Sequence, residues 1–224
     1  KATLYPKECG CQTVWGEAQD GSGIVYISAL GMQGTHIGND GIYVIKSNQY
    51  STQSLLVYDG LNVSICFDGV DFAGNYGKVG FDAGKSNVNL TLKGENSITT
   101  LDADTFVSAG NLTIDGDGSL LITSNYDDNT YYNPGVPFNT TGAHTVIKGG
   151  NICAMGGDLF SVMINDDITN GDLVIEQNAF FYAENGIDTV PVNGDGEKVY
   201  PLIVDNPNEY VICIEWYAFP FRTL

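Results

Sequence analysis

Residues 86–123 read S-N-V-N-L-T-L-K-G-E-N-S-I-T-T-L-D-A-D-T-F-V-S-A-G-N-L-T-I-D-G-D-G-S-L-L-I-T, and this stretch contains the same phrase twice. The first copy covers residues 87–99 and the second covers residues 109–123. Each copy is a short alternating strand, a glycine corner and a second short strand. The corner glycines, Gly94 and Gly116, lie 22 residues apart, and a repeat period in the twenties is typical of stacked solenoids. The sequence therefore predicts an all-β solenoid.

Three further stretches repeat this plan, at residues 62–71, 143–155 and 171–183. In the last of them Asn178 stands where the others have a corner glycine, and Asn is the residue that best replaces glycine at a positive φ. The spacing is broken once, by an insertion at residues 124–141. An insertion in a repeat array forms a loop on one face, which is often the binding face.

The period-two alternation also predicts which residues stack inside the solenoid. Leu90 and Leu92 are expected to match Leu112 and Ile114 one rung away. Outward positions such as Thr91 and Thr113 then share the other face. A buried column of Leu and Ile is expected to supply most of the stability.

The phrase N-L-T-[LI]-x-G-x-x-S-[IL] resembles the rungs of bacterial cell-surface carbohydrate-binding domains that are built as right-handed parallel β-helices. The resemblance covers about residues 60–185 and is carried most closely by residues 87–99 and 110–123. It implies a right-handed parallel β-helix related in shape to pectate lyases. It also implies a calcium-assisted polysaccharide-binding or adhesin-like protein at the cell surface or outside the cell.

We expect three regions along the chain. Residues 1–21 show no repeat and are predicted to form an N-terminal cap, because a solenoid must close its open end against edge pairing. Residues 22–197 are predicted to form the parallel β-helix. Residues 198–224 are expected to be a small C-terminal β element or the start of a following domain. Two strands are predicted there, at residues 198–205 and 210–217, and one arrangement for them is a hairpin.

Composition narrows the classes of partner. The chain has 27 acidic and 9 basic residues and a formal charge of −18, so it lacks the cations that neutralise nucleic-acid phosphates. No apolar run approaches the roughly 20 residues of a membrane-spanning helix. We therefore expect neither nucleic-acid binding nor membrane insertion. The five cysteines do not show zinc-site spacing, and they are predicted to be small buried apolar residues in strands, with a disulfide framework as the less favoured alternative.

Aspartates recur in pairs at the predicted turns. Carboxylate oxygens at short spacing suit Ca²⁺, although Asp at a turn more commonly bonds its own backbone. Pairs at residues 127–128 and 166–167 are also available. The first choice for a calcium site is the set in successive rungs: Asp102, Asp104, Asp115 and Asp117.

The insertion is the candidate site for a sugar. Sugar rings present C–H faces to aromatic rings, and their hydroxyls bond to amides and carboxylates. The loop offers such groups in Tyr126, Asp127, Asp128, Tyr131, Tyr132 and Asn133. An alternative of about equal weight is a loop whose aromatic rings join copies of the protein. Asn139, within an N-x-T sequon, is the candidate glycosylation site.

Three functions remain open at this level. The preferred one is non-catalytic binding of a polysaccharide or glycan, with Ca²⁺ as cofactor. The second is a structural fibre, tail-spike or surface-layer subunit that uses the solenoid as a rigid spacer. The third, a polysaccharide lyase or glycoside hydrolase, is less favoured because uronate elimination needs cationic groups and the rungs contain few. His144, at the start of a rung, is expected to be structural.

Overall fold

All of the regular structure in the described residues is β-strand, which confirms the all-β prediction. The computed structural model describes residues 12–14, 23–27, 34–46, 54–74, 76–125, 135–157, 160–164, 171–185, 187–188, 202–205, 211–213 and 222–223. In residues 12–14, 188, 202–205, 211–213 and 222–223 the description is limited to the backbone. Within these ranges there is no helix long and apolar enough to cross a membrane.

The described strands form three parallel ladders. The first ladder contains β2 (Ile24–Ile27), β4 (Gly41–Ile45), β6 (Asn62–Asp68), β9 (Asn87–Lys93), β12 (Asn111–Gly116), the first halves of β15 (His144–Gly156) and β17 (Asp172–Ala183), β19 (Leu202–Asp205) and β21 (Arg222–Thr223). The second ladder contains β7 (Asp71–Ala73), β10 (Glu95–Leu101), β13 (Ser119–Asn125), the second halves of β15 and β17, and β20 (Val211–Cys213). The third ladder contains β1 (Gln12–Val14), β3 (Thr35–Ile37), β5 (Leu55–Val57), β8 (Phe81–Asp82), β11 (Phe106–Val107), β14 (Phe138–Asn139), β16 (Val162–Met163) and β18 (Ile187–Asp188).

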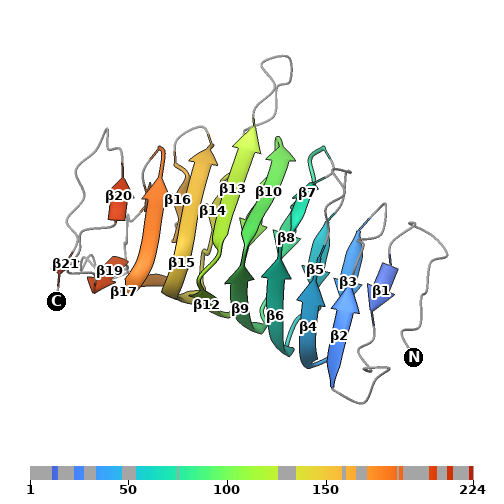
Figure 1. Cartoon of the computed structure of the whole chain (residues 1–224). Coiled ribbons are helices and arrows are strands. Elements are labelled where there is room, and N and C mark those ends of the chain that lie inside the picture. Colours follow the sequence, from blue (N-terminus) through green and yellow to red (C-terminus); the bar gives the residue numbers. More distant parts are fainter. Residues whose placement is uncertain are drawn as a thin grey trace, which may run out of the picture.

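From β6 to β20 the chain visits the three ladders in rotation, and we call one such rotation a coil. Before β6, the described strands belong to the first and third ladders only. It passes through β6, β7 and β8, then returns to the first ladder with β9, which pairs in parallel with β6. Figure 1 shows β2, β4, β6 and β9 of the first ladder side by side, with their arrows in one direction and their colours in sequence order. This arrangement is consistent with the predicted parallel β solenoid.

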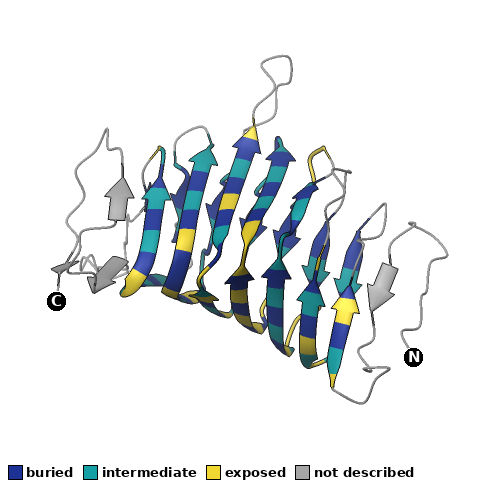
Figure 2. Ribbon diagram, viewed as in Figure 1, coloured by how far each residue is buried: buried dark blue, intermediate teal, exposed yellow. Residues whose placement is uncertain are grey.

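The core lies between the ladders and follows the predicted alternation. Along β9, buried and exposed residues alternate, with Val88, Leu90 and Leu92 facing inward. The same banding is visible on the other central strands (Figure 2). Register pairing places inward residues of successive coils above one another, giving a fully buried column of Ile65, Leu90, Ile114, Ile147 and Ile175. Burial of each such side chain contributes about 1.5–3 kcal/mol.

The register between the two defining phrases differs from the prediction by two residues. Ile114 pairs with Leu90, not with Leu92, and Leu92 pairs with Gly116. The reason is that Gly116 still belongs to β12, so the corner follows it. Gly118 occupies that corner and donates its N–H to the carbonyl of Leu92 at 3.1 Å. Thr91 and Thr113 do face outward, as predicted.

Asn178 does not take the conformation expected of a corner residue. Asp102 is the only described non-glycine residue with a positive φ. In the neighbouring coil the positive φ belongs to Gly150, which pairs with Ala179, while Gly149 pairs with Asn178. The bend in β17 is therefore made without the left-handed conformation that the sequence predicted for Asn178.

Phenylalanine rings form a second column inside the core, which the period-two alternation does not predict. Phe81, Phe106 and Phe138 occupy equivalent positions of the third ladder. Their ring centroids are 4.6 Å apart for Phe81 and Phe106 and 5.2 Å apart for Phe106 and Phe138. Phe67 and Phe181 extend this stack at its two ends. Such tilted and edge contacts add about 0.5–1.5 kcal/mol per pair to simple burial.

The described parts of both chain ends continue the ladders. At the N-terminus, β1 pairs in parallel with β3, and the rest of the predicted cap lies outside the described residues. At the C-terminus, the two expected strands are present as β19 and β20. They do not form the hairpin considered above, because each pairs in parallel with a different half of β17.

Candidate functional site

The insertion connects the second ladder to the third. Its bounds are narrower than the predicted residues 124–141, because β13 continues to Asn125 and β14 begins at Phe138, so the insertion lies between these two strands. The six predicted ligand-binding residues lie outside the described residues: Tyr126, Asp127, Asp128, Tyr131, Tyr132 and Asn133. Residues 166–167 lie outside them as well. The structure does describe the two points at which the insertion joins the solenoid.

Asp104 fixes the returning end of the insertion. Its Oδ1 atom accepts the backbone N–H of Val136 at 2.7 Å, and its Oδ2 atom accepts the Nδ2 amide of Asn139 at 2.8 Å. Gly135 packs so closely here that a Cβ atom would lie 2.1 Å from the backbone nitrogen of Asp104. Asp104 belongs to the preceding coil, so its carboxylate seats the insertion on a neighbouring turn of the solenoid.

Asp102 shapes the turn that carries Asp104. It is 8% exposed and has a φ of 53°, a left-handed conformation that Asp tolerates better than most residues. Its N–H donates to the carbonyl of Asn125 at 3.0 Å, which holds the outgoing end of the insertion. Behind the turn, the Thr100 hydroxyl donates to the carbonyl of Ala103 at 2.8 Å and lies 2.6 Å from the Thr105 hydroxyl. Both ends of the insertion are thus tied to one turn.

Asp115 and Asp117 lie at the opposite end of the second ladder. Both are exposed, and Asp115 Oδ1 accepts the N–H of Gly116 at 2.7 Å. The seven residues of β13 separate this corner from the Asp102 turn, and a strand of that length spans ~20 Å. The four aspartates of the predicted calcium site therefore form two separate pairs.

Metal binding by these pairs stays a prediction. Within the described ranges, no three Asp, Glu, His or Cys side chains gather closely enough to hold a metal ion. Ca²⁺ also accepts backbone carbonyls and amide oxygens as ligands. The Asp102 turn offers such oxygens beside the insertion, whereas the Asp115 corner lies away from it. The first pair is for this reason the one relevant to a ligand held by the insertion.

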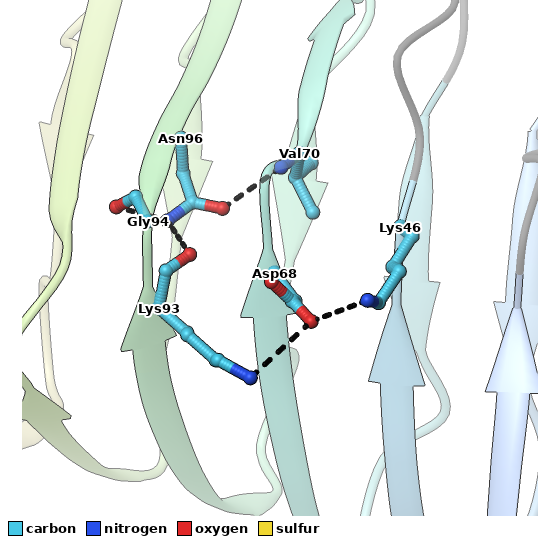
Figure 3. A network of polar contacts seen from close by, with 6 residues as sticks. All are labelled: Lys46, Asp68, Val70, Lys93, Gly94 and Asn96. Carbon is cyan, nitrogen blue, oxygen red and sulfur yellow. Dashed lines mark hydrogen bonds and ion pairs between the residues drawn. The ribbon is translucent and has the colours of Figure 1, made fainter.

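A chain of charges crosses the outer face of the first ladder near the ends of its strands (Figure 3). The Nζ atom of Lys46 lies 2.7 Å from Asp68 Oδ2, and Nζ of Lys93 lies 3.8 Å from the same oxygen. The hydrogen bond from Lys46 lowers the pKa of Asp68, and the same bond raises the pKa of Lys46. Two ion pairs to one carboxylate thereby link three consecutive coils, and the group of three keeps a net charge of +1.

Asn96 lies just beyond the corner at Gly94 and links three coils; Figure 3 shows its contacts with Val70, Lys93 and Gly94. The side chain is buried, and its Oδ1 atom accepts the N–H of Val70 at 2.8 Å. Its Nδ2 atom donates to the carbonyl of Ser119 at 2.9 Å and lies 3.3 Å from that of Lys93. A buried amide with its hydrogen bonds satisfied in this way stabilises the corner and is structural.

A row of exposed amides lies at the opposite end of the first ladder, where its strands begin. We call Asn62, Asn87 and Asn111 the amide row. Asn87 Nδ2 donates to Asn62 Oδ1 at 2.7 Å, and Asn111 Nδ2 donates to Asn87 Oδ1 at 2.7 Å. Each Asn opens one copy of the repeated phrase, and this recurrence is the signal in the sequence that indicates the row.

His144 occupies the next position after the amide row. Its Nδ1 atom lies 2.5 Å from Asp172 Oδ1, and both side chains are substantially exposed. Asp172 pairs with His144 in the ladder register. A polar side chain therefore stands at the start of five successive strands of the first ladder. His144 links two coils, in keeping with the structural role predicted for it.

Asn139 is held by two hydrogen bonds. Its Nδ2 atom donates to Asp104, as described above, and its Oδ1 atom accepts the N–H of Thr141 at 3.1 Å. Attachment of a glycan would replace one of the two Nδ2 hydrogens and leave the other to donate to Asp104. Glycosylation of Asn139 stays a prediction, and the described contacts give this side chain a role in seating the insertion.

The two cysteines with described side chains face outward and are free. Cys66 and Cys153 are half-buried, in β6 and β15 respectively, and burial raises the pKa of both thiols. They are therefore not core residues, contrary to the prediction. Both thiols lie among the outward-facing side chains of neighbouring strands, which cover part of each one. The side chains of the other three cysteines lie outside the described residues.

Comparison of the chain with protein-family models, with curated proteins and with solved structures found no significant match.

Proposed function

We propose that this protein is a non-catalytic polysaccharide-binding or adhesion domain, displayed outside the cell or at its surface and supported by Ca²⁺. The observation that carries the proposal is the fixed seat of the insertion. Asp104, Asp102 and Gly135 tie both of its ends to a single turn. A loop anchored on a rigid scaffold is the usual place for binding residues, and this loop is rich in Tyr, Asp and Asn.

We also propose a finer fold, a closed right-handed parallel β-helix with residues 1–21 as its cap. Parallel strands joined by crossover connections are right-handed in about 98% of cases. The rotation of the chain through three parallel ladders supplies crossover connections of the kind to which this preference applies. A closed coil would give the insertion a stiff base, which lowers the entropy lost when a flexible ligand binds.

The loop aromatics provide the most direct test. The double variant Tyr131→Ala and Tyr132→Ala should lose binding in isothermal titration calorimetry against hydroxyethylcellulose, galactomannan and polygalacturonate. Stacking contributes most of the apolar contact with a sugar ring, so we expect a loss of about tenfold, or ~1.4 kcal/mol. The matched control is Tyr26→Ala, because Tyr26 is 63% exposed and lies on β2, far along the solenoid. Equal binding by wild type and the double variant would contradict the proposal.

A structural role is the second candidate, favoured by exposed apolar side chains on the outer face of the first ladder. Tyr26 is 63% exposed and Ile42 is 48% exposed on the neighbouring strands β2 and β4. Such a patch fits a contact between copies of the chain. Sedimentation velocity should then show oligomers that dissociate in the variant Tyr26→Ser with Ile42→Ser.

New reducing ends or unsaturated uronate absorbance in the binding mixtures would instead support the enzymatic alternative.

A further inference from the structure

The first ladder carries two adjacent rows of uncharged polar side chains on its outer face. The amide row stands at the start of β6, β9 and β12. Two residues further along the same strands, Ser64, Asn89 and Thr113 form a second outward row, in register with one another. Neighbouring members of a row are one strand spacing apart, ~4.8 Å. This is close to the length of one pyranose ring in an extended chain.

The amide row keeps unused hydrogen-bonding capacity. Each link in the row uses one N–H and one oxygen lone pair of an amide. An amide has two N–H donors and two lone pairs, so the central Asn87 retains one donor and one acceptor directed to solvent. All three amides are exposed. The links also fix the orientation of the amides, so that a ligand need not order them on binding.

The turns that lead into these strands are fastened to one another. The buried Ser86 hydroxyl donates to the carbonyl of Tyr58 at 2.7 Å and accepts the N–H of Leu61 at 3.0 Å. Asp59 Oδ1 accepts the N–H of Lys85 at 2.9 Å. These bonds join the turns of two successive coils. The amide row therefore rests on a rigid base, and its spacing is set by the ladder.

The charge of this surface selects the kind of ligand. The two rows themselves contain no ionisable group: Asp40, which accepts the backbone N–H of Asn62 at 2.8 Å, flanks them on one side, and the pair of His144 and Asp172 flanks them on the other. The chain of Lys46, Asp68 and Lys93 lies at the other end of the first ladder. A formal charge of −18 on the whole chain disfavours an anionic polymer. Hydroxyl groups of a neutral sugar match the free amide donors and acceptors without a cost for burying charge.

We infer that the outer face of β6, β9 and β12 binds a neutral polysaccharide that runs across the strands, with one sugar ring per coil against the amide row. This inference rests on the proposed function, because both assume a polysaccharide ligand. It adds a second surface, separate from the insertion, and it specifies a neutral ligand. Asn87 has the central position, since its amide bonds to both neighbours.

Affinity electrophoresis in native gels tests the inference. The gels contain hydroxyethylcellulose, galactomannan or polygalacturonate, and the proteins are wild type, Asn87→Ala, Asn89→Ala and Asn151→Ala. Asn151 is the matched control, because it is an exposed strand asparagine on the second ladder. We expect a gel that contains a neutral polysaccharide to retard both wild type and Asn151→Ala. Each row variant should lose about fivefold to thirtyfold in apparent affinity, as expected for one or two hydrogen bonds of ~1 kcal/mol.

The possible results separate this inference from the proposed function. The inference would be overturned, and the proposed function left in place, if Asn87→Ala and Asn89→Ala are retarded as strongly as wild type while the Tyr131 and Tyr132 double variant is not retarded. Retardation of wild type by polygalacturonate alone would also overturn the inference and leave the proposed function in place. No retardation of wild type by any polymer would overturn both. Urea unfolding midpoints that match wild type would show that the row variants remain folded.

Discussion

Single polar side chains tie neighbouring coils together at the turns, where the strand ladders leave backbone groups without partners. Such groups must find a partner when they are buried. Asn96 supplies one for Val70, and Asp104 supplies one for Val136. In both cases the side chain comes from one coil and the backbone group from another. These residues determine how the turns stack, whereas the strands determine how the ladders stack.

The contribution of Asp104 can be measured by its removal. Asp104→Ala leaves the Val136 N–H and the Asn139 amide without their acceptor, so we expect a loss of about 1–3 kcal/mol in unfolding free energy. Urea denaturation in the presence of a chelator measures it. Asp115→Ala is the control, because Asp115 is exposed and bonds only to the adjacent N–H. That change should stay within about 0.5 kcal/mol. Equal losses in the two variants would show that Asp104 does not seat the insertion.

Two aspartates should respond to acid in opposite ways. The hydrogen bond from Lys46 lowers the pKa of Asp68 below its usual 3.8, so its stabilising effect is present above that value and disappears as the pH falls through the folded pKa. Burial raises the pKa of Asp82 above 3.8, an effect that the N–H of Gly84 partly opposes. Its stabilising effect is present below 3.8 and disappears as the pH rises through the raised folded pKa.

Substitution by Asn separates these two effects. Asp68→Asn should reduce the stability lost between neutral pH and about pH 3, whereas Asp82→Asn should increase it. Asn can still accept the N–H of Gly84 in place of Asp82, so the backbone contact is kept. The measurement is the urea midpoint as a function of pH for wild type and both variants. A shift of the acid limb in the same direction for both would contradict the assignment.

At the scale of the strands, the third ladder depends on its column of aromatic rings. Its central strands are only two residues long, so backbone pairing alone gives them little stability. Phe106 lies between Phe81 and Phe138 and is fully buried. Phe106→Ala should therefore destabilise the protein by about 3–5 kcal/mol. Leu121→Ala, at a position 38% exposed on the second ladder, should change stability far less. Thermal and urea unfolding compare the two.

The sequence predicted the strands well and their register poorly. Alternation identifies Leu90 and Ile114 as inward-facing, because period two follows directly from strand geometry. It does not show that Gly116 stays within β12, since a glycine at the corner and a glycine in the strand look alike in sequence. Only the pairing of Gly118 with the neighbouring coil fixes the corner. The phenylalanine column was missed for a similar reason, because the short strands of the third ladder show no alternation.

At the scale of the whole molecule, the repeat was enough to predict a parallel all-β solenoid. The same repeat concealed the candidate surfaces. Asn62, Asn87 and Asn111 appeared as parts of a strand phrase, and their alignment into a row depends on how the coils stack. The aspartates appeared able to converge, but a full strand separates the Asp102 turn from the Asp115 corner. Sequence spacing gives the length of a coil, whereas the position of each side chain depends on where the coil turns.

Thermal unfolding tests the central claim, polysaccharide binding by the folded solenoid, most directly. The melting temperature of chelator-treated protein is measured with and without millimolar Ca²⁺, in the presence of hydroxyethylcellulose, galactomannan or polygalacturonate. A ligand that binds only the folded state raises the melting temperature by mass action. At a free ligand concentration of one hundred times the dissociation constant, the gain in unfolding free energy is ~2.7 kcal/mol. The account predicts a rise with a neutral polysaccharide that is larger when Ca²⁺ is present. An unchanged melting temperature with every polymer and with Ca²⁺ would contradict it and favour the structural spacer.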